Sequence, residues 1–597
     1  MISETKQCQN CKQDFIIEPD DFAFYEKMGV PVPVWCIDCR LQRRFSFRNE
    51  RILYKRKCNA PGHDEDIISI YSPDKKIKVY DHNFWWGDDW DPMEYGMDLD
   101  FSISFMKQFG ELMHNVPAQA LLNFNAVNSE YCNYTTDNKN CYLVFGGDFN
   151  ENCSYSTFNM RSKDSMDMYW TDHCELSYEV VDCGSCYKVT HSRYVGVCND
   201  CMFMYQCEGC SNCFGCVNLK KKSYCIFNEQ YTKEEYEKKM KEIAPHRYSN
   251  LEKIKKQFNE LKLSQPHRYA QILKAVNSSG ENLIEVKDCK KCFDVVGPAE
   301  NMKDVFLAGW GAKDARGCDH FGHGSELAHD SFTVFSGDSN VICSYLISSS
   351  QNVQYSYNCR GCNNIFGCVG LKSKSYCIFN KQYSKEEYEK LVPEIKQHMN
   401  DVPYIDSKGK EYKYGEFFSP EISLFGYNET TAQEYFRLEK DVALEAGYIW
   451  HEEEEKKYES TVSYNDLPDT IEEVRDDIVK EIILCKHEGK CDEGCTKAFR
   501  ITSQELQFYR RLNLPLPRFC SSCRYTQRLR SRPPLKLWKR VCQCAGIESD
   551  NGVYPNNASS HQSHSKEQHC TNEFETTYSP DRKEIVYCEQ CFQAEVA

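Results

Sequence analysis

The sequence lacks the features that mark secreted and membrane proteins. Met1 to Cys8 contains no apolar segment of the kind found in a secretory signal. No apolar run in the 597-residue chain approaches the length of about eighteen residues that a membrane helix needs. We therefore expect a cytoplasmic protein with no membrane partner.

The chain also lacks an excess of positive charge. It holds 73 Lys and Arg against 89 Asp and Glu, which gives a formal net charge of −16. This balance argues against a protein that coats nucleic acid over its whole surface. A basic patch on an acidic body is still compatible with it.

Cysteine, in contrast, is abundant, with 36 residues. In a large cytoplasmic chain, cysteines indicate metal ligands or reduced, buried thiols rather than disulfides. Two C-x-x-C pairs near the amino terminus have the spacing that places two thiolates at adjacent corners of a zinc tetrahedron. They predict a zinc site formed by Cys8, Cys11, Cys36 and Cys39.

A similar module returns near the carboxyl terminus at an offset of 484 residues, where Cys36 and Cys39 correspond to Cys520 and Cys523. The strict counterpart of Cys8 is Asp492, so we expect the adjacent cysteine to act as the ligand. A second cysteine group follows, which brings the expected total to about three zinc ions. The predicted ligands are Cys491, Cys495, Cys520 and Cys523 for one ion and Cys542, Cys544, Cys588 and Cys591 for the other.

The amino-terminal module has only a remnant of that second group. Cys58 is retained, whereas Asp81 and Phe84 stand at the places of the last two cysteines. Either His63 or His82 is near enough in the sequence to assist, but we do not expect this remnant to bind metal. We also expect a flexible loop, without ligands, at the insertion that holds His561, His564, His569 and Cys570.

The amino-terminal module resembles the zinc-ribbon family of treble-clef type over about forty residues. The signature comprises C-x-x-C, an aromatic pair, prolines and C-x-x-C-R, and its residues here are Cys8, Cys11, Phe15, Phe24, Tyr25, Gly29, Pro31, Pro33, Cys36, Cys39 and Arg40. The whole chain further resembles long, uncharacterised bacterial proteins that carry this module at both ends. The resemblance implies zinc binding and supplies no activity.

A basic segment follows the last cysteine of each module. Arg40 to Lys57 and Arg518 to Arg540 each hold eight Arg and Lys, with Glu50 as the one acid between them. Helices here would turn their guanidinium groups outward to phosphate, while nearby aromatic rings stack on bases. The alternative is a solvated helix face neutralised by the acidic body. The candidate nucleic-acid-binding residues are Arg40, Arg43, Arg44, Arg48, Arg51, Arg524, Arg528, Arg530 and Arg532.

An internal duplication occupies the middle of the chain, where Gly209 to Met240 returns as Gly361 to Val392 without a gap. In the first copy, cysteines recur at intervals of 21 residues, at Cys132, Cys153 and Cys174. Small apolar residues at such a period predict a parallel β-solenoid whose coils stack like residues inward.

The solenoid cysteines are expected to be buried filler, because the duplicate has Val353 where the first copy has Cys201. A metal role for the cysteines that recur in both copies is a minority alternative. Capping boxes that begin at Thr232 and Ser384 predict a helix at the end of each copy.

We therefore predict a β-rich multidomain protein with a duplicated, Cys-lined parallel β-solenoid between treble-clef or zinc-ribbon modules. The expected segments are a zinc-ribbon module at 1–100, a first solenoid copy at 120–231, a helical connector at 232–280, a second copy at 281–400, a mixed wrapping segment at 401–484 and a double zinc-ribbon module at 485–597.

The function expected from these features is that of a zinc-binding, non-enzymatic protein that contacts RNA or ribonucleoprotein through its arginine-rich segments. The first alternative is a scaffold that binds a protein partner through the solenoid face. The second is an enzyme that works along the solenoid groove. It is the least favoured, because no paired carboxylates, triad or phosphate loop can be named, and His451-Glu452 does not continue into H-E-x-x-H.

Overall fold

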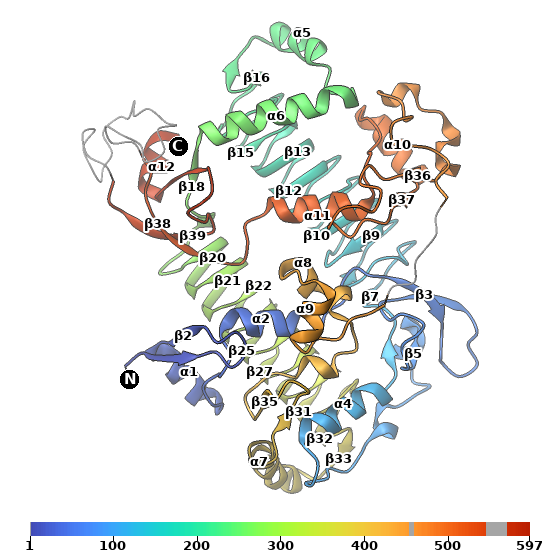
Figure 1. Cartoon of the computed structure of the whole chain (residues 1–597), viewed down its shortest axis with the longest axis vertical. Helices are drawn as coiled ribbons and strands as arrows, with labels where there is room; N and C mark the ends of the chain where they lie inside the picture. Colours follow the sequence, from blue (N-terminus) through green and yellow to red (C-terminus); the bar gives the residue numbers. More distant parts are fainter. Residues whose placement is uncertain (1, 453–458, 545–569, 597) are drawn as a thin grey trace. The chain divides into compact units, whose positions relative to one another are not determined.

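The computed structural model describes residues 2–452, 459–544 and 570–596 (Figure 1). These residues form a strand-rich fold with twelve α-helices and two large parallel sheets. The chain divides into two compact units, each built from two separate segments. Unit 1 comprises residues 1–121 and 270–452, and unit 2 comprises residues 122–269 and 453–597. Each unit thus combines one terminal cysteine module with one copy of the duplication.

The first parallel ladder belongs to unit 2. Its strands pair in parallel at a constant offset of 12 residues, so that Thr157, Tyr169, Val181, Arg193 and Tyr205 form one column. Its strands are β7 (Asn123–Phe124), β8 (Thr135–Thr136), β9 (Tyr142–Phe145), β10 (Ser154–Met160), β11 (Tyr169–Asp172), β12 (Tyr178–Gly184), β13 (Tyr187–Gly196), β14 (Asn199–Met202) and β15 (Tyr205–Glu208).

This ladder has a three-residue repeat. Every third residue from Cys132 to Cys216 is buried, and every third residue from Tyr134 to Phe227 has a positive φ. Left-handed backbone is unfavourable for most side chains, and Asn, Asp and Gly tolerate it best. Four such triplets make one coil of 12 residues. The inward positions are filled by Cys, Ser, Val and Met, which the narrow interior accommodates.

The expected interval of 21 residues is therefore wrong as a coil length. Cys132 pairs with the coil that carries Val144, and Cys141 lies one coil before Cys153. Because 21 is a multiple of three, that interval preserves the inward phase of the repeat. It equals one coil plus three triplets, so it moves from one side of the coil to another.

The second ladder belongs to unit 1 and begins with longer coils. Phe306, Asp319, Phe332 and Tyr345 form a column at offsets of 13 residues, and the offset becomes 12 at Tyr357. Its strands are β19 (Ile272–Leu273), β20 (Gly280–Lys290), β21 (Cys292–Lys303), β22 (Phe306–Gly309), β23 (Ala312–Arg316), β24 (Asp319–Gly322), β25 (Glu326–His329), β26 (Phe332–Phe335), β27 (Ser339–Ile342), β28 (Tyr345–Ser348), β29 (Gln351–Gln354), β30 (Tyr357–Arg360), β31 (Asn363–Phe366), β32 (Ser375–Ile378) and β33 (Lys381–Gln382).

The helices predicted from the capping boxes are confirmed. The Thr232 and Ser384 hydroxyls accept the amide N–H of the glutamate three residues on, at the start of α5 (Lys233–Ile243) and α7 (Lys385–Asp401). In unit 2 a hairpin of β16 (Cys225–Ile226) and β17 (Glu229–Gln230) precedes α5. Each ladder thus ends in a hairpin and a helix.

The connector is only partly helical. Helix α6 (Tyr248–Ser264) ends before Pro266, since proline disfavours helix at the residue before it. The next segment forms β18 (Pro266–Arg268), which pairs in parallel with β40 (Ile585–Tyr587) of the carboxyl-terminal module. The expectation of a helical connector over 232–280 is therefore wrong beyond Ser264.

The terminal modules are built from short hairpins and helices. In unit 1 these are β1 (Glu4–Gln7), β2 (Asp14–Ile17), α1 (Pro19–Met28), α2 (Ile37–Phe45), β3 (Tyr54–Lys57), β4 (Asp66–Ser69), β5 (Val79–Tyr80), α3 (His82–Trp86), α4 (Phe105–Asn115) and β6 (Ala118–Gln119). In unit 2 they are β36 (Ile483–Leu484), β37 (Ala498–Phe499), α10 (Ser503–Leu512), α11 (Ser521–Ser531), β38 (Trp538–Val541), β39 (Glu573–Thr576), β40 and α12 (Glu589–Val596).

The segment after α7 packs against the second ladder in unit 1. Phe417, Phe418 and Tyr412 are fully buried in the same core as Phe47 and Phe109. Its elements are β34 (Tyr404–Ile405), β35 (Glu411–Tyr412), α8 (Thr431–Tyr435) and α9 (Lys440–Glu445). Among the residues that the structure describes, no helix combines the length and the apolar character that crossing a membrane requires.

Candidate metal centres and arginine clusters

The amino-terminal cysteines gather as predicted. The four Sγ atoms of Cys8, Cys11, Cys36 and Cys39 lie within 4.8 Å of one another, and those of Cys11 and Cys36 are 3.6 Å apart. Zinc–sulfur bonds of about 2.3 Å at tetrahedral angles require sulfurs about 3.8 Å apart. The amide N–H of Cys36 also donates to Cys8 Sγ at 3.2 Å. Hydrogen bonds from Cys36 and Cys39 lower the pKa of Cys8, which favours a thiolate.

The corresponding site in unit 2 uses a different cysteine from the one predicted. Cys485 joins Cys495, Cys520 and Cys523 in the quartet, whereas Cys491 lies 3.8 Å from Cys523 in an adjoining group. The amide N–H of Cys520 donates to Cys485 Sγ at 3.3 Å, as that of Cys36 does to Cys8. Cys485 is therefore the counterpart of Cys8.

The error came from counting residues along the chain. Cys8 N–H donates to the Gln13 carbonyl and Cys485 N–H to the Lys497 carbonyl, so both close a hairpin loop. The unit 2 loop is seven residues longer, which moves the first cysteine away from the constant offset. Loops tolerate such insertions at little energetic cost.

The last cysteine group contains one more thiol than predicted. Cys570 lies with Cys542, Cys544 and Cys591 within 4.8 Å, and its Sγ is 3.9 Å from that of Cys588. The expectation that this residue belongs to a flexible loop without ligands is wrong. His561, His564 and His569 lie outside the described residues. The group therefore offers five thiols for one tetrahedral ion.

The ladder cysteines behave as buried filler. Cys183 and Cys201 are almost fully buried, and their thiols donate to the carbonyls of Val181 and Asn199, two residues earlier. The equivalent donation recurs along both ladders, for example from Cys359 to Tyr357. A thiol that is buried and bonded to backbone is chemically inert, so these residues fill the interior.

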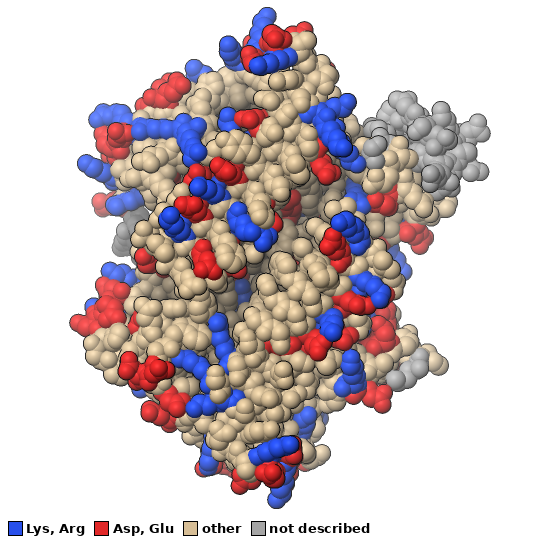
Figure 2. All heavy atoms as spheres, turned by 180° about the vertical axis from the view of Figure 1, so that it is seen from behind, with Lys and Arg blue, Asp and Glu red and all other residues tan. Residues whose placement is uncertain are grey.

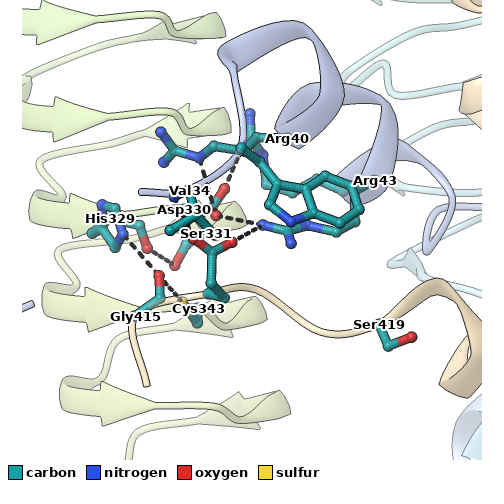
Figure 3. A network of polar contacts seen from close by, with 12 residues as sticks. Val34, Arg40, Arg43, His329, Asp330, Ser331, Cys343, Gly415 and Ser419 are labelled. Carbon is teal, nitrogen blue, oxygen red and sulfur yellow. Dashed lines mark hydrogen bonds and ion pairs between the residues drawn. The ribbon is translucent and has the colours of Figure 1, made fainter. Parts of the chain in front are cut away.

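The arginines after Cys39 lie inside unit 1 rather than on its surface. Arg40, Arg43 and Arg44 project from α2 and are at most 4% exposed. Figure 3 shows Arg40 and Arg43 reaching the Asp330 carboxylate, with N···O distances of 3.2 Å for each. Arg44 also forms an ion pair with Asp330.

Two further carboxylates complete this cluster. Arg43 pairs with Glu416 at 3.0 Å and Arg44 with Asp319 at 2.6 Å, so three guanidinium groups face three acids. Burial opposes ionisation of Asp330, but Arg40, Arg44 and Arg43 outweigh it and hold its pKa well below the usual range. Burial raises the pKa of Asp319 to about 6 despite Arg44.

The remaining unit 1 arginines of the predicted set are also enclosed. Arg48 is 2% exposed, pairs with Glu50 at 3.2 Å and donates to Thr333 Oγ1 at 2.7 Å. Arg51 is half-buried. None of the three residues Arg40, Arg43 and Arg44 presents its guanidinium to solvent.

Unit 2 repeats the arrangement around one carboxylate. Asp167 is fully buried and pairs with Arg524 at 2.9 Å and with Arg528 at 2.8 Å, both from α11. Arg532 pairs with the buried Asp182 at 2.9 Å. Arg530 is the exception, since its side chain is 46% exposed and faces Asp492. Asp167 and Asp330 both have a positive φ and so lie at left-handed turns of their ladders.

The expectation that these helices turn their guanidinium groups outward is therefore wrong, except at Arg530. The acids that receive them come from distant parts of the sequence, which the local charge pattern did not reveal. On the face seen in Figure 2, Lys and Arg lie interspersed with Asp and Glu rather than gathered into a patch of one sign. The binding of nucleic acid is itself untested by the structure.

Comparison with known proteins adds little. No family model and no curated protein matches the chain. Solved structures do match, among them one from Desulfovibrio desulfuricans G20 described as a "putative acetyltransferase". It is 8% identical, the match covers 48% of this chain and 85% of that one, and the TM-score is 0.10. A likeness this weak carries no argument about fold or activity.

One expectation is corrected by this finding. The sequence led us to expect a protein that is not an enzyme, and the matched structure bears the description of an enzyme. We therefore withdraw that expectation, although the match is too weak to assign an activity. The resemblance to the zinc-ribbon family rests on the cysteine groups, which could bind metal and are compatible with such modules.

Proposed function

We propose that this protein is a zinc-stabilised interaction scaffold. In this proposal each terminal module is a zinc ribbon of treble-clef type, and each ladder is a solenoid to which one module is locked. The observation that carries the proposal is the buried contact between the two. In both units, two arginines of the helix after C-x-x-C share one aspartate of the ladder: Arg40 and Arg44 with Asp330, and Arg524 and Arg528 with Asp167.

Such a contact serves cohesion rather than recognition of an external ligand. A guanidinium that is desolvated and already paired has no free donors for a phosphate, and breaking the pair would leave a buried charge. Zinc adds to the cohesion, because small modules of this kind lack a core large enough to fold without metal. The modules would therefore hold the solenoids in shape and leave their outer surfaces free.

The surface available to a partner lies on the first solenoid. Phe149 and Val197 are 55% and 63% exposed and stand four coils apart in one column, whereas most large apolar side chains of the unit are buried. Beside this column, Asn128, Asn140 and Asn152 form a ladder of side-chain amide hydrogen bonds at 3.1 Å. A rigid surface with exposed rings and paired amides suits a protein partner.

Charge reversal tests the proposal against its rival, contact with RNA or ribonucleoprotein. Arg528→Glu should lower the unfolding midpoint of the protein sharply, and Arg530→Glu, on the same helix but exposed, should not. In parallel, wild-type protein is titrated with mixed RNA at low salt. Weak or absent binding supports the scaffold. Tight, salt-dependent binding that a folded Arg530→Glu variant loses would favour RNA contact.

The partner surface has its own test. Affinity capture with wild-type protein is compared with capture by a Phe149→Glu, Val197→Glu double variant that retains the wild-type unfolding midpoint. We expect specific protein partners to be lost from the variant. Identical capture by both forms would show that this face is not the binding surface.

A further inference from the structure

The pocket after β3 in unit 1 corresponds, residue for residue, to the five-cysteine group of unit 2. Lys57 pairs with Asp66 at the end of the β3–β4 hairpin, as Val541 pairs with Glu573 in β38–β39. The next amide closes each hairpin, since Cys58 N–H donates to the carbonyl of Glu65 and Cys542 N–H to that of Asn572.

The third segment of each pocket aligns by the same kind of contact. Asn59 N–H donates to the Val79 carbonyl at 2.8 Å, and Gln543 N–H donates to the Val586 carbonyl at 3.0 Å. Counting from these contacts fixes five equivalent positions. Cys58, Ala60, His63, Asp81 and Phe84 stand where unit 2 has Cys542, Cys544, Cys570, Cys588 and Cys591.

The hydrogen bonds to sulfur are equivalent too. Cys58 Sγ accepts the amide N–H groups of Ala60 at 3.4 Å and Asp81 at 3.3 Å. Cys542 Sγ accepts those of Cys544 at 3.5 Å and Cys588 at 3.2 Å. Backbone amides directed at a sulfur stabilise its thiolate form, which is the form that binds metal.

We propose that this pocket is a metal site with mixed ligands: Cys58 Sγ, His63 Nδ1, Asp81 and Glu65. It reverses our expectation that the remnant binds no metal, and it does not depend on the scaffold function. Three of the four ligands occupy positions that carry cysteines in unit 2. The fourth, Glu65, replaces the thiols that Ala60 and Phe84 cannot provide.

The separations between the candidate ligand atoms fit a tetrahedral zinc ion. All four lie within 4.8 Å of one another. Bonds of about 2.0 Å to nitrogen and oxygen and about 2.3 Å to sulfur give edges of about 3.3 to 3.5 Å. Cys58 Sγ lies 3.7 Å and His63 Nδ1 lies 3.4 Å from an Asp81 oxygen. The distance from His63 Nδ1 to Glu65, 2.6 Å, is that of a hydrogen bond and would lengthen on metal binding.

The nearby His82 is a poor candidate for the same ion. Its Nδ1 contacts the side-chain amide of Gln119 at 2.9 Å, on the far side of the Asp81 turn. His63, in contrast, packs its ring against Phe84 at 5.0 Å between ring centres, which holds it in the pocket. The sequence alone left both histidines open, and the structure selects His63.

The pocket is more open than the five-cysteine group. The side chains of Glu65 and His63 are 50% and 32% exposed, while every thiol of the unit 2 group is at most 6% exposed. A site with one thiolate and accessible oxygen ligands should bind zinc more weakly and exchange it faster than an all-cysteine site. We therefore infer a loosely held fourth ion beside three tightly held ones.

The test uses the full-length protein, purified under reducing conditions and dialysed against micromolar zinc. Bound metal is counted by mass spectrometry, and release to a chromogenic chelator is followed in time. We expect four zinc ions per chain, one of which leaves first. His63→Ala should bind three and lose the fast phase, and the matched control His82→Ala should bind four.

Cobalt provides a second readout and a gain-of-ligand variant. The fourth equivalent of Co²⁺ should add a charge-transfer band of one thiolate, much weaker than the bands of the cysteine quartets. Ala60→Cys should strengthen that band and slow release of the fourth ion at least tenfold. If His63→Ala does not fold, Glu65→Gln replaces it. Three ions in wild type, or four in both wild type and the folded His63 or Glu65 variant, would overturn the proposal.

Discussion

The two units use the same arginine lock but different second metal sites. In unit 2 five cysteines close the pocket after β38, whereas in unit 1 one cysteine, a histidine and two acids line the pocket after β3. The Arg–Asp contact, by comparison, is retained, since α2 reaches Asp330 and α11 reaches Asp167. The comparison teaches that the docking of module onto ladder is constrained more tightly than the ligands of the second site.

Zinc removal should break the comparison most strongly. Stripping the metal with a strong chelator under reducing conditions removes the bonds that hold Cys8 to Cys36 and Cys485 to Cys520. We expect unfolding temperatures to fall by more than about 10 °C, because zinc binding in such modules is worth about 10 kcal/mol or more. Calorimetry with and without restored zinc measures this. Unchanged unfolding would show that the cysteine groups hold no structural metal.

Removing the shared aspartate should have the next largest effect. Asp330→Asn leaves three guanidinium groups short of a charge and Asp167→Asn leaves two, so the former should cost more. We expect losses of about 3 to 5 kcal/mol in the free energy of unfolding, from urea denaturation. The control is Asp172→Asn, whose partner Arg161 is 45% exposed, and which should cost under about 1 kcal/mol. Equal small losses at all three sites would contradict the lock.

A buried carboxyl in each unit should make stability depend on pH. Burial raises the pKa of Asp338 to about 7 and that of Asp148 to about 6. Unfolded carboxyls titrate near about 4, so the native protein binds more protons above that pH, and stability falls as pH rises. Asp338→Asn should flatten the unfolding midpoint between about pH 4 and 7, and Asp148→Asn between about pH 4 and 6. Unaltered pH profiles would refute this.

The smallest effect is expected in the ladder interior. Cys201 and Val353 occupy equivalent places in the duplicated segments and are both almost fully buried. Cys201→Val should therefore change the free energy of unfolding by less than about 1.5 kcal/mol and leave the zinc count unaltered. Loss of one metal ion from this variant would show that the ladder thiols are ligands after all.

Short-range spacing accounts for what the sequence predicted correctly. C-x-x-C places Cys36 and Cys39 on one turn wherever it occurs, and the capping box of Thr232 acts within four residues. Cys485 and Cys570 were missed because long loops separate them from the other ligands. A cysteine directly after a predicted strand, as Cys8 follows β1, would have identified Cys485.

Long-range pairing accounts for what the sequence could not show. Asp330 lies 290 residues from Arg40, so nothing local distinguished a buried lock from a basic surface. The three-residue repeat was accessible in principle, because Asn and Asp recur at its left-handed positions, for example Asn140, Asn152 and Asp164. A search at period three rather than near twenty would have found the 12-residue coil.

The most direct test of the arginine lock is a double-mutant cycle between Asp167 and Arg524, measured by urea unfolding of wild type, Asp167→Asn, Arg524→Gln and the double variant. The account predicts a coupling energy of about 1.5 to 3 kcal/mol, since each single change strands a buried partner. A coupling within about 0.5 kcal/mol of zero would contradict it and return these arginines to the role of an external binding surface.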